Sequence, residues 1–204
     1  MIALHTARHI YTVGHSNHPI EQFLHLLKHN AINAVADVRS RPFSRRYSHF
    51  NKERLAATLA QNDIAYVFLG AELGARSDDE SCYECGQVQY ARLAATSLFQ
   101  QGIDRVLIGA KKFRVALMCA EKEPLDCHRT LLVSRALEKR GVAILHILAD
   151  GSIEPQPQTM TRLIDMVGLG GRDMFADAAA LAEDACRLRE SKIAYVKPQR
   201  GVEP

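Results

Sequence analysis

The stretch IYTVGHSNHPIEQFLHLLKHN, residues 10–30, contains the unit on which the predicted fold is built. Its first five residues are a short apolar run, rich in β-branched residues and closed by glycine, which is typical of a buried strand. After a polar turn, Pro19 suits the first turn of a helix, and apolar residues recur at helical spacing from Ile20 to Asn30. The stretch therefore predicts a strand, a polar turn and a helix.

The same unit recurs along the chain. Further short apolar runs lie at residues 32–38, 64–69, 115–119 and 142–148. Helical patterns separate them at residues 51–62, 90–101, 102–112 and 127–140. The polar, turn-rich residues 75–88 predict an insertion or long loop on the ligand side of the sheet. Strands that alternate with helices indicate right-handed crossovers. We expect an α/β fold with a mainly parallel sheet of about five strands and helices on both faces.

The composition changes after Asp150 and Gly151. Two prolines, Pro155 and Pro157, lead into helical patterns near residues 159–167 and 173–190, with glycines between them. A chain of 204 residues can hold one domain with an appendage. We expect an α/β domain over residues 1–153 and a helical C-terminal extension over residues 154–204, packed on this domain or flanking it.

Composition narrows the class of protein. The chain is 47% hydrophobic and 24% charged with a net charge of +3, as in ordinary globular proteins. It has no apolar run of about 18 residues and no apolar signal region at its start. An odd count of five cysteines favours reduced thiols. We therefore expect a cytoplasmic protein with no membrane partner, and the sequence does not indicate an oligomeric state.

Polar residues follow the ends of the predicted strands. Ligands of parallel α/β sheets bind outside the carboxyl ends of the strands, where the N-termini of helices also point. The topology predicts that one set of side chains converges there: His15, Ser16, Asn17, Asp37, Arg39, Glu72, Cys119, Glu121, Cys127, His128 and Arg129.

The segment CAEKEPLDCHR, residues 119–129, is the most informative part of this set. With Asp126 as a helix cap, Cys127, His128 and Arg129 would form the first turn, where free N–H groups and the helix dipole favour an anion. Arg129 would add a bidentate cation, and His128 could exchange a proton near neutral pH. Neither Cys119 nor Cys127 is followed by arginine at the spacing of a phosphatase loop, which excludes that mechanism.

Two other interpretations of the cysteines remain open. In the first, Cys119 and Cys127 are simply small buried residues, and Arg129 belongs to a structural ion pair. In the second, the pair Cys82 and Cys85 has the CxxC spacing of a zinc site, which Cys119, Cys127 or His128 could complete. One CxxC pair is a weak signal, so we assign no metal ligand and no cofactor.

A basic stretch lies between Arg39 and Arg54. Six cations oppose the single acid Glu53, and three aromatic residues are interleaved with them: Arg39, Arg41, Arg45, Arg46, Lys52 and Arg54, with Phe43, Tyr47 and Phe50. The stretch is either a solvated surface or a contact region for phosphate or nucleic acid, in which an aromatic side chain stacks on a base.

Three motifs resemble those of a widespread bacterial family of unknown function. They are TVGHSN at residues 12–17, DVRSRPFS at 37–44 and CAEKEPLDCHR at 119–129, and the likeness extends over roughly residues 8–153, including HILADG at 146–151. The resemblance implies no particular reaction. Its motif residues fall on the strand ends chosen above: Gly14, His15, Ser16, Asp37, Arg39, Ser40, Pro42, Cys119, Glu121, Cys127, His128 and Arg129.

Two functions are compatible with these residues. The first is an enzyme acting on a small anionic, phosphate-bearing or nucleotide-like substrate, with Glu121 or His128 as general acid or base and Cys119 or Cys127 as nucleophile. The residues expected to bind that substrate are His15, Ser16, Asp37, Arg39, Ser40 and Arg129. The second is a non-catalytic nucleic-acid-binding module that uses the basic stretch. The sequence does not decide between them.

Overall fold

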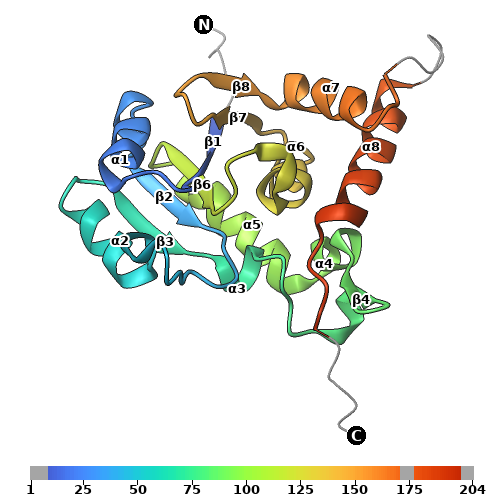
Figure 1. The fold of residues 1–204 in the computed structure, drawn as a ribbon, viewed down its shortest axis with the longest axis horizontal. Helices are drawn as coiled ribbons and strands as arrows, with labels where there is room; N and C mark the ends of the chain where they lie inside the picture. Colours follow the sequence, from blue (N-terminus) through green and yellow to red (C-terminus); the bar gives the residue numbers. More distant parts are fainter. Residues whose placement is uncertain (1–8, 171–176, 199–204) are drawn as a thin grey trace, which may run out of the picture.

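A six-stranded sheet is the centre of the computed structural model, which describes residues 9–170 and 177–198. The strand order is β3-β2-β6-β1-β7-β8, and all neighbours are parallel except β7 and β8 (Figure 1). The strands are β1 (His9–Gly14), β2 (Ala34–Asp37), β3 (Ala65–Phe68), β6 (Val115–Cys119), β7 (Ala143–Ile147) and β8 (Ile153–Pro155). The expectation of an α/β fold with about five mainly parallel strands is confirmed, and β8 is an additional antiparallel edge strand.

Helices cover both faces of the sheet, as expected. The alternation along β6 shows this directly, because Leu117 packs into one hydrophobic cluster and its neighbour Met118 into another. The cluster around Met118 includes Phe23 of α1 (Ile20–His29) and Leu55 of α2 (Lys52–Ala60). The cluster around Leu117 includes Leu73 and Phe99, which precede β6 in the chain, and Leu163 and Cys186 of the C-terminal helices.

The two helices before β6 do not divide where the sequence pattern suggested. They are α4 (Tyr90–Ala95) and α5 (Ser97–Gly109), so a break at Gly102 was wrong. Thr96 makes the break, because its hydroxyl caps α5 by accepting from the N–H of Phe99 at 3.2 Å. Gly102 is instead a contact point, since a Cβ there would lie 2.7 Å from the side chain of Leu73 in α3 (Gly70–Leu73).

The segment after β6 also differs from the expected single helix over residues 127–140. A 3₁₀ turn, η3 (Pro124–Asp126), comes first, and Cys127 then has extended backbone angles, φ −136° and ψ 139°. The helix begins at His128 and runs through a π-helical segment, η4 (Arg129–Ser134), into α6 (Arg135–Glu138). Asp126 as an N-cap was therefore wrong, because it lies inside η3 and its carboxylate pairs with Arg189.

The polar segment at residues 75–88, expected as an insertion or long loop, contains short regular elements. They are a 3₁₀ turn, η2 (Glu80–Cys82), and a hairpin of β4 (Tyr83–Glu84) and β5 (Gln87–Val88); a further 3₁₀ turn, η1 (Ser48–Phe50), precedes α2. The C-terminal part of the chain adds to this hairpin, because Val88 N–H donates to the carbonyl of Tyr195 at 2.9 Å.

The C-terminal region consists of β8, α7 (Gln156–Met166) and α8 (Ala178–Ile193). The start of the second expected helix, residues 173–176, lies outside the described residues. Cys186 of α8 is buried in the cluster around Leu117, and α8 leads the chain back to the hairpin (Figure 1). The boundary between residues 153 and 154 stays a prediction. Over residues 9–170 and 177–198, no helix combines the length and apolar character needed to cross a membrane.

Candidate functional site

The carboxyl ends of β1, β2 and β6 meet at one edge of the sheet. Gly14 is paired in register with Cys119, and Asp37 with Met118. Two further hydrogen bonds of 2.9 Å, from the N–H groups of His15 and Ser16 to the carbonyls of Cys119 and Ala120, continue the pairing past the strand ends. The residues that the sequence placed at these strand ends are thus brought together.

Four of these residues form a group, which we call the thiol cluster: the buried Cys119, Cys127 and His128, and the exposed Glu121. Glu121 Oε2 lies 2.9 Å from Cys119 Sγ and 3.0 Å from Cys127 Sγ. Imidazole Nδ1 of His128 lies 3.7 Å from the first sulfur and 3.9 Å from the second. Both thiols and the imidazole are buried, with exposed fractions of 3%, 1% and 8% for Cys119, Cys127 and His128.

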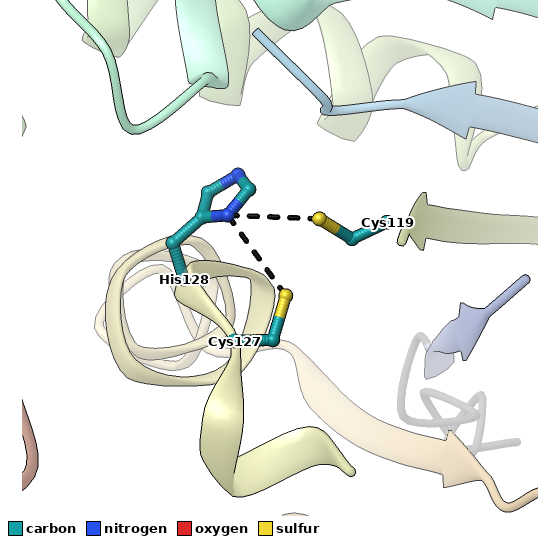
Figure 2. Close-up of side chains that lie close together, drawn as sticks. All are labelled: Cys119, Cys127 and His128. Atoms are coloured by element: carbon teal, nitrogen blue, oxygen red, sulfur yellow. Dashed lines mark hydrogen bonds between the residues drawn. The ribbon is translucent and has the colours of Figure 1, made fainter. Parts of the chain in front are cut away.

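The imidazole of His128 is oriented by the backbone. Its Nε2 lies 3.0 Å from the carbonyl oxygen of Val38, and a carbonyl only accepts, so the ring hydrogen is on Nε2. The lone pair of Nδ1 therefore points at the two sulfurs, as Figure 2 shows. Val38 directly follows β2. The end of this strand therefore fixes the orientation of the His128 ring, which belongs to the segment after β6.

Charge is distributed unequally over the two thiols. Burial raises the pKa of Cys119, and the adjacent Cys127 raises it further. Burial also opposes ionisation of Cys127, but the hydrogen bond with Cys119 and the charge of Arg129 outweigh it and lower its pKa. Partial desolvation of the Glu121 carboxylate is outweighed by its contacts with Cys119 and Cys127, which lower its pKa. Despite burial, contacts with Cys127 raise the pKa of His128. Cys127 is therefore the thiol that ionises first.

Arg129 lies inside the protein rather than in the pocket. Its side chain is fully buried, and Nη1 and Nη2 donate to the carbonyls of Glu121 and Lys122 at 2.6 and 3.2 Å. Gly14 packs against the same loop, since a Cβ at that position would lie 1.9 Å from the carbonyl oxygen of Glu121. Arg129 and Gly14 thus hold the loop that connects the two cysteines.

Asp37 and Arg39 form a buried ion pair below the pocket. Nε and Nη2 of Arg39 donate to the two carboxylate oxygens at 2.9 and 2.6 Å, and the Tyr66 hydroxyl donates to Asp37 Oδ2 at 2.7 Å. Nη1 of Arg39 donates to His15 Nε2 at 3.1 Å, while His15 Nδ1 donates to the carbonyl of Ser16 at 2.9 Å. Burial and the charge of Arg39 lower the pKa of His15 to about 4, so this imidazole is neutral at physiological pH.

An inner pocket of about 250 Å³ opens onto the thiol cluster. Cys119, Glu121 and His128 line its floor, and its walls carry Arg39, Ser40, Arg41, Arg76, Tyr90 and Tyr195. Ser40 accepts from the N–H of Arg76 at 3.1 Å, and the guanidinium of Arg76 stacks 4.5 Å above the ring of Tyr195. No carboxylate of the described residues forms an ion pair with Arg41 or Arg76.

An outer groove of about 560 Å³ adjoins the inner pocket, because Arg39, Arg41 and Ala120 line both. Its other lining residues are His15, Ser16, Asn17, Phe43, Ser44 and Tyr47. The ring of Phe43 is 69% exposed. Glu72 does not join either space: it pairs with Arg105, away from the strand ends where it was expected.

Sequence reasoning missed several residues of this region. Tyr66 lies on β3 and had no polar neighbour in the sequence to mark it. Arg76 belongs to the loop that was expected on the ligand side, so its place in the sequence could have indicated it. Tyr195 reaches the pocket only because the C-terminal segment returns to the hairpin.

The fold and the site define the class: an α/β protein with two buried thiols and a buried imidazole, beside one carboxylate, at the carboxyl ends of a mainly parallel sheet. The chain belongs to the family described as domain of unknown function DUF488, whose profile matches residues 19–136. The match includes the DVRSRPFS and CAEKEPLDCHR segments, while TVGHSN and HILADG lie outside it. Neither the curated proteins nor the solved structures contain a match to this chain.

Proposed function

We propose that this protein is an enzyme acting on a phosphate-bearing, nucleotide-like substrate, which occupies the inner pocket and the outer groove together. The observation that carries the proposal is the continuity of the two spaces across Arg39 and Arg41. One space offers cations beside the thiol cluster, and the other offers the exposed ring of Phe43 and the half-buried ring of Tyr47.

The charges of the inner pocket support an anionic ligand. Arg39 is already neutralised by Asp37, so the binding charge comes from Arg41 and Arg76. Both are exposed, and guanidinium groups match the geometry of phosphate oxygens. Asp126 also lines the pocket, but its carboxylate is paired with Arg189, so it opposes the anion less than a free carboxylate would.

The outer groove supports a planar ring next to that anion. Phe43 and Tyr47 both line it, and an aromatic side chain stacks on any base. Inorganic phosphate would use only the inner pocket, whereas a nucleotide would use both spaces.

The thiol cluster is the reaction centre of this proposal. Cys119, Glu121 and His128 line the floor of the inner pocket, directly beside the proposed anion site. His15 and Arg129 are positioning residues: the hydrogen bonds of each are taken up by neighbouring protein groups. Ser16 and Ser40 line the outer groove and the inner pocket respectively.

Calorimetric titration with nucleoside monophosphates, nucleosides and inorganic phosphate tests the binding step. We expect Arg41→Ala and Arg76→Ala to weaken binding of phosphate and nucleotides alike. Phe43→Ala should weaken nucleotide binding by roughly 5- to 160-fold, the range of about 1–3 kcal/mol for base stacking, and leave phosphate binding unchanged. Arg187→Ala, an exposed arginine on α8, is the control. Absence of nucleotide binding, or binding unaffected by these three substitutions, would refute the proposal.

The catalytic step has its own test. The bound nucleotide is incubated with wild-type protein and with Glu121→Gln, and the products are separated by chromatography. Turnover should be lost in the variant while nucleotide affinity changes little. If the nucleotide is bound but never converted, the protein is a binding protein and the enzyme assignment is wrong.

A nucleic-acid-binding module is the second candidate. Arg45 and Arg46 are exposed next to the groove, and the guanidinium of Arg46 lies 5.3 Å from the Tyr47 ring centroid, which extends the basic surface beyond the pocket. This candidate predicts oligonucleotide binding that weakens with salt and with the double substitution of Arg45 and Arg46 by alanine. Binding that is insensitive to both would exclude it.

A further inference from the structure

We infer that Cys119, Cys127 and His128 are the protein ligands of a tetrahedral zinc ion, with the fourth coordination position at the floor of the inner pocket. The inference starts from the three donor atoms. The two Sγ atoms and His128 Nδ1 all lie within 4.8 Å of one another, and all three residues are buried. It does not depend on the proposed substrate.

The distances fit such an ion closely. Zinc bonds of about 2.3 Å to sulfur and about 2.0 Å to nitrogen, at a tetrahedral angle, separate the sulfur and nitrogen atoms by about 3.5 Å. The observed separations from Nδ1 are 3.7 Å to Cys119 and 3.9 Å to Cys127. A shift of a few tenths of an ångström in each side chain would therefore complete the geometry.

The surroundings are those of a metal-binding histidine. Such a residue donates its second ring N–H to a carbonyl or carboxylate, which fixes the ring and directs the other nitrogen at the metal. His128 does this through Val38 (3.0 Å), and Figure 2 shows Nδ1 directed at both sulfurs. The Cys127 sulfur also accepts from the N–H of Arg129 at 3.4 Å, a contact that stabilises a thiolate.

The cluster also has an excess of acceptors over hydrogens. With His128 neutral, the two sulfurs, Nδ1 of His128 and Oε2 of Glu121 are four acceptors, whereas the two thiols and the N–H of Arg129 supply at most three hydrogens. A cation among these atoms would satisfy all of them at once. Two sulfur ligands and one imidazole select a borderline-soft ion such as zinc, since magnesium and calcium take oxygen ligands.

The fourth position is open to the pocket. Cys119 and His128 line the inner pocket, and Glu121 lines it beside them. Three protein ligands with one open position are the pattern of catalytic rather than structural zinc sites. A zinc ion there could bind a water molecule or a substrate oxygen, a consequence that does rest on the proposed function. Cys82 and Cys85, the CxxC pair, are not part of this group of close donor atoms.

Metal content of the full-length chain is the first test. We expect about one equivalent of zinc in protein purified from zinc-supplemented culture. In chelator competition, Cys119→Ser, Cys127→Ser and His128→Asn should each lower zinc affinity by more than about 100-fold, and Glu121→Gln by about 10- to 100-fold, as for outer partners of a metal site. Cys186→Ser, a buried cysteine on α8, and Cys82→Ser should retain the zinc.

Cobalt substitution reports the ligands directly. The reduced, metal-free chain is titrated with Co²⁺, and thiolate-to-cobalt charge-transfer bands with intense tetrahedral d–d bands should appear and then vanish when Zn²⁺ is added. Circular dichroism of each variant shows whether it is folded. Wild-type protein that gives no such bands and holds no stoichiometric zinc would overturn the inference, as would bands lost in Cys82→Ser but kept in Cys127→Ser. Arg41→Ala and Arg76→Ala should leave the zinc content and the cobalt bands unchanged. A failure of the nucleotide proposal can therefore be distinguished from a failure of the zinc proposal.

Discussion

The stability of this protein should fall in mild acid because of His146, a buried residue of β7. Its Nε2 lies 2.5 Å from Gln156 Oε1, and its Nδ1 lies 2.7 Å from the Thr12 hydroxyl. An amide oxygen only accepts, so Nε2 carries the hydrogen and the hydroxyl donates to Nδ1. A second proton would place a cation in a fully buried site, and this burial lowers the pKa of His146 from 6.5 to about 4.

The direction and size of this pH effect follow from the difference in proton binding between the folded and the unfolded chain. Between pH 6.5 and 4 the unfolded chain binds a proton at His146 that the folded chain does not, so the free energy of unfolding falls as the pH falls through this window. From pH 7.5 to pH 5.0 the contribution of this one residue is a loss of about 2 kcal/mol. His15, whose pKa is also lowered to about 4, adds a separate loss of the same sign.

Urea unfolding followed by far-ultraviolet circular dichroism at pH 7.5 and pH 5.0 measures this contribution. The loss between the two pH values should be smaller by about 2 kcal/mol in His146→Gln than in wild type, because the titrating group is gone. Ile144→Val, a buried change on the same strand, should cost about 1 kcal/mol at both pH values and keep the full pH dependence. Equal losses in wild type and His146→Gln would refute the reasoning.

Three further substitutions test the structure around the site. Gly14→Ala should lower the free energy of unfolding by about 1–3 kcal/mol or more, because its methyl group meets the backbone of Glu121, and a normal unfolding midpoint would contradict this. Asp37→Ala should lower the free energy of unfolding by about 3–5 kcal/mol because it leaves the buried Arg39 unpaired. Tyr66→Phe removes one hydrogen bond to Asp37 and should lower it by about 1 kcal/mol. Similar losses for the two variants in urea unfolding would show that the ion pair is not the dominant contact.

The strands could be predicted because each is short, apolar and buried. The pattern at residues 115–119 gave the bounds of β6 without error, and the end of β1 at Gly14 was also correct. Since the strands are parallel, the position of the site followed from topology alone. The strand β8 was missed because three residues that contain a proline carry too little periodic signal.

The helix boundaries were less predictable because local signals compete with packing. Asp126 has the side chain of a good N-cap, yet its partner is Arg189, sixty-three residues away in the sequence. Gly102 resembles a helix break but is retained inside α5 because Leu73 packs against it. Contacts of this kind depend on tertiary structure, which no local pattern contains.

The sequence predicted which side chains lie at the strand ends, whereas it did not predict their orientations and contacts. Arg129 was expected to bind a ligand, but its guanidinium donates to two backbone carbonyls. A sequence shows which side chains follow a strand, and it does not show which of them turn inward. The exposed cations that line the inner pocket are Arg41 and Arg76.

The buried position of Arg129 connects stability to the geometry of the thiol cluster. A guanidinium without solvent costs free energy, and its Nε has no hydrogen-bond partner among the described residues. Its two carbonyl partners belong to the loop between Cys119 and Cys127, and its own N–H contacts the sulfur of Cys127. Replacing it by an apolar side chain would remove the buried cation and, with it, both hydrogen bonds to the loop. The same residue thus holds in place the loop that joins the two cysteines of the thiol cluster.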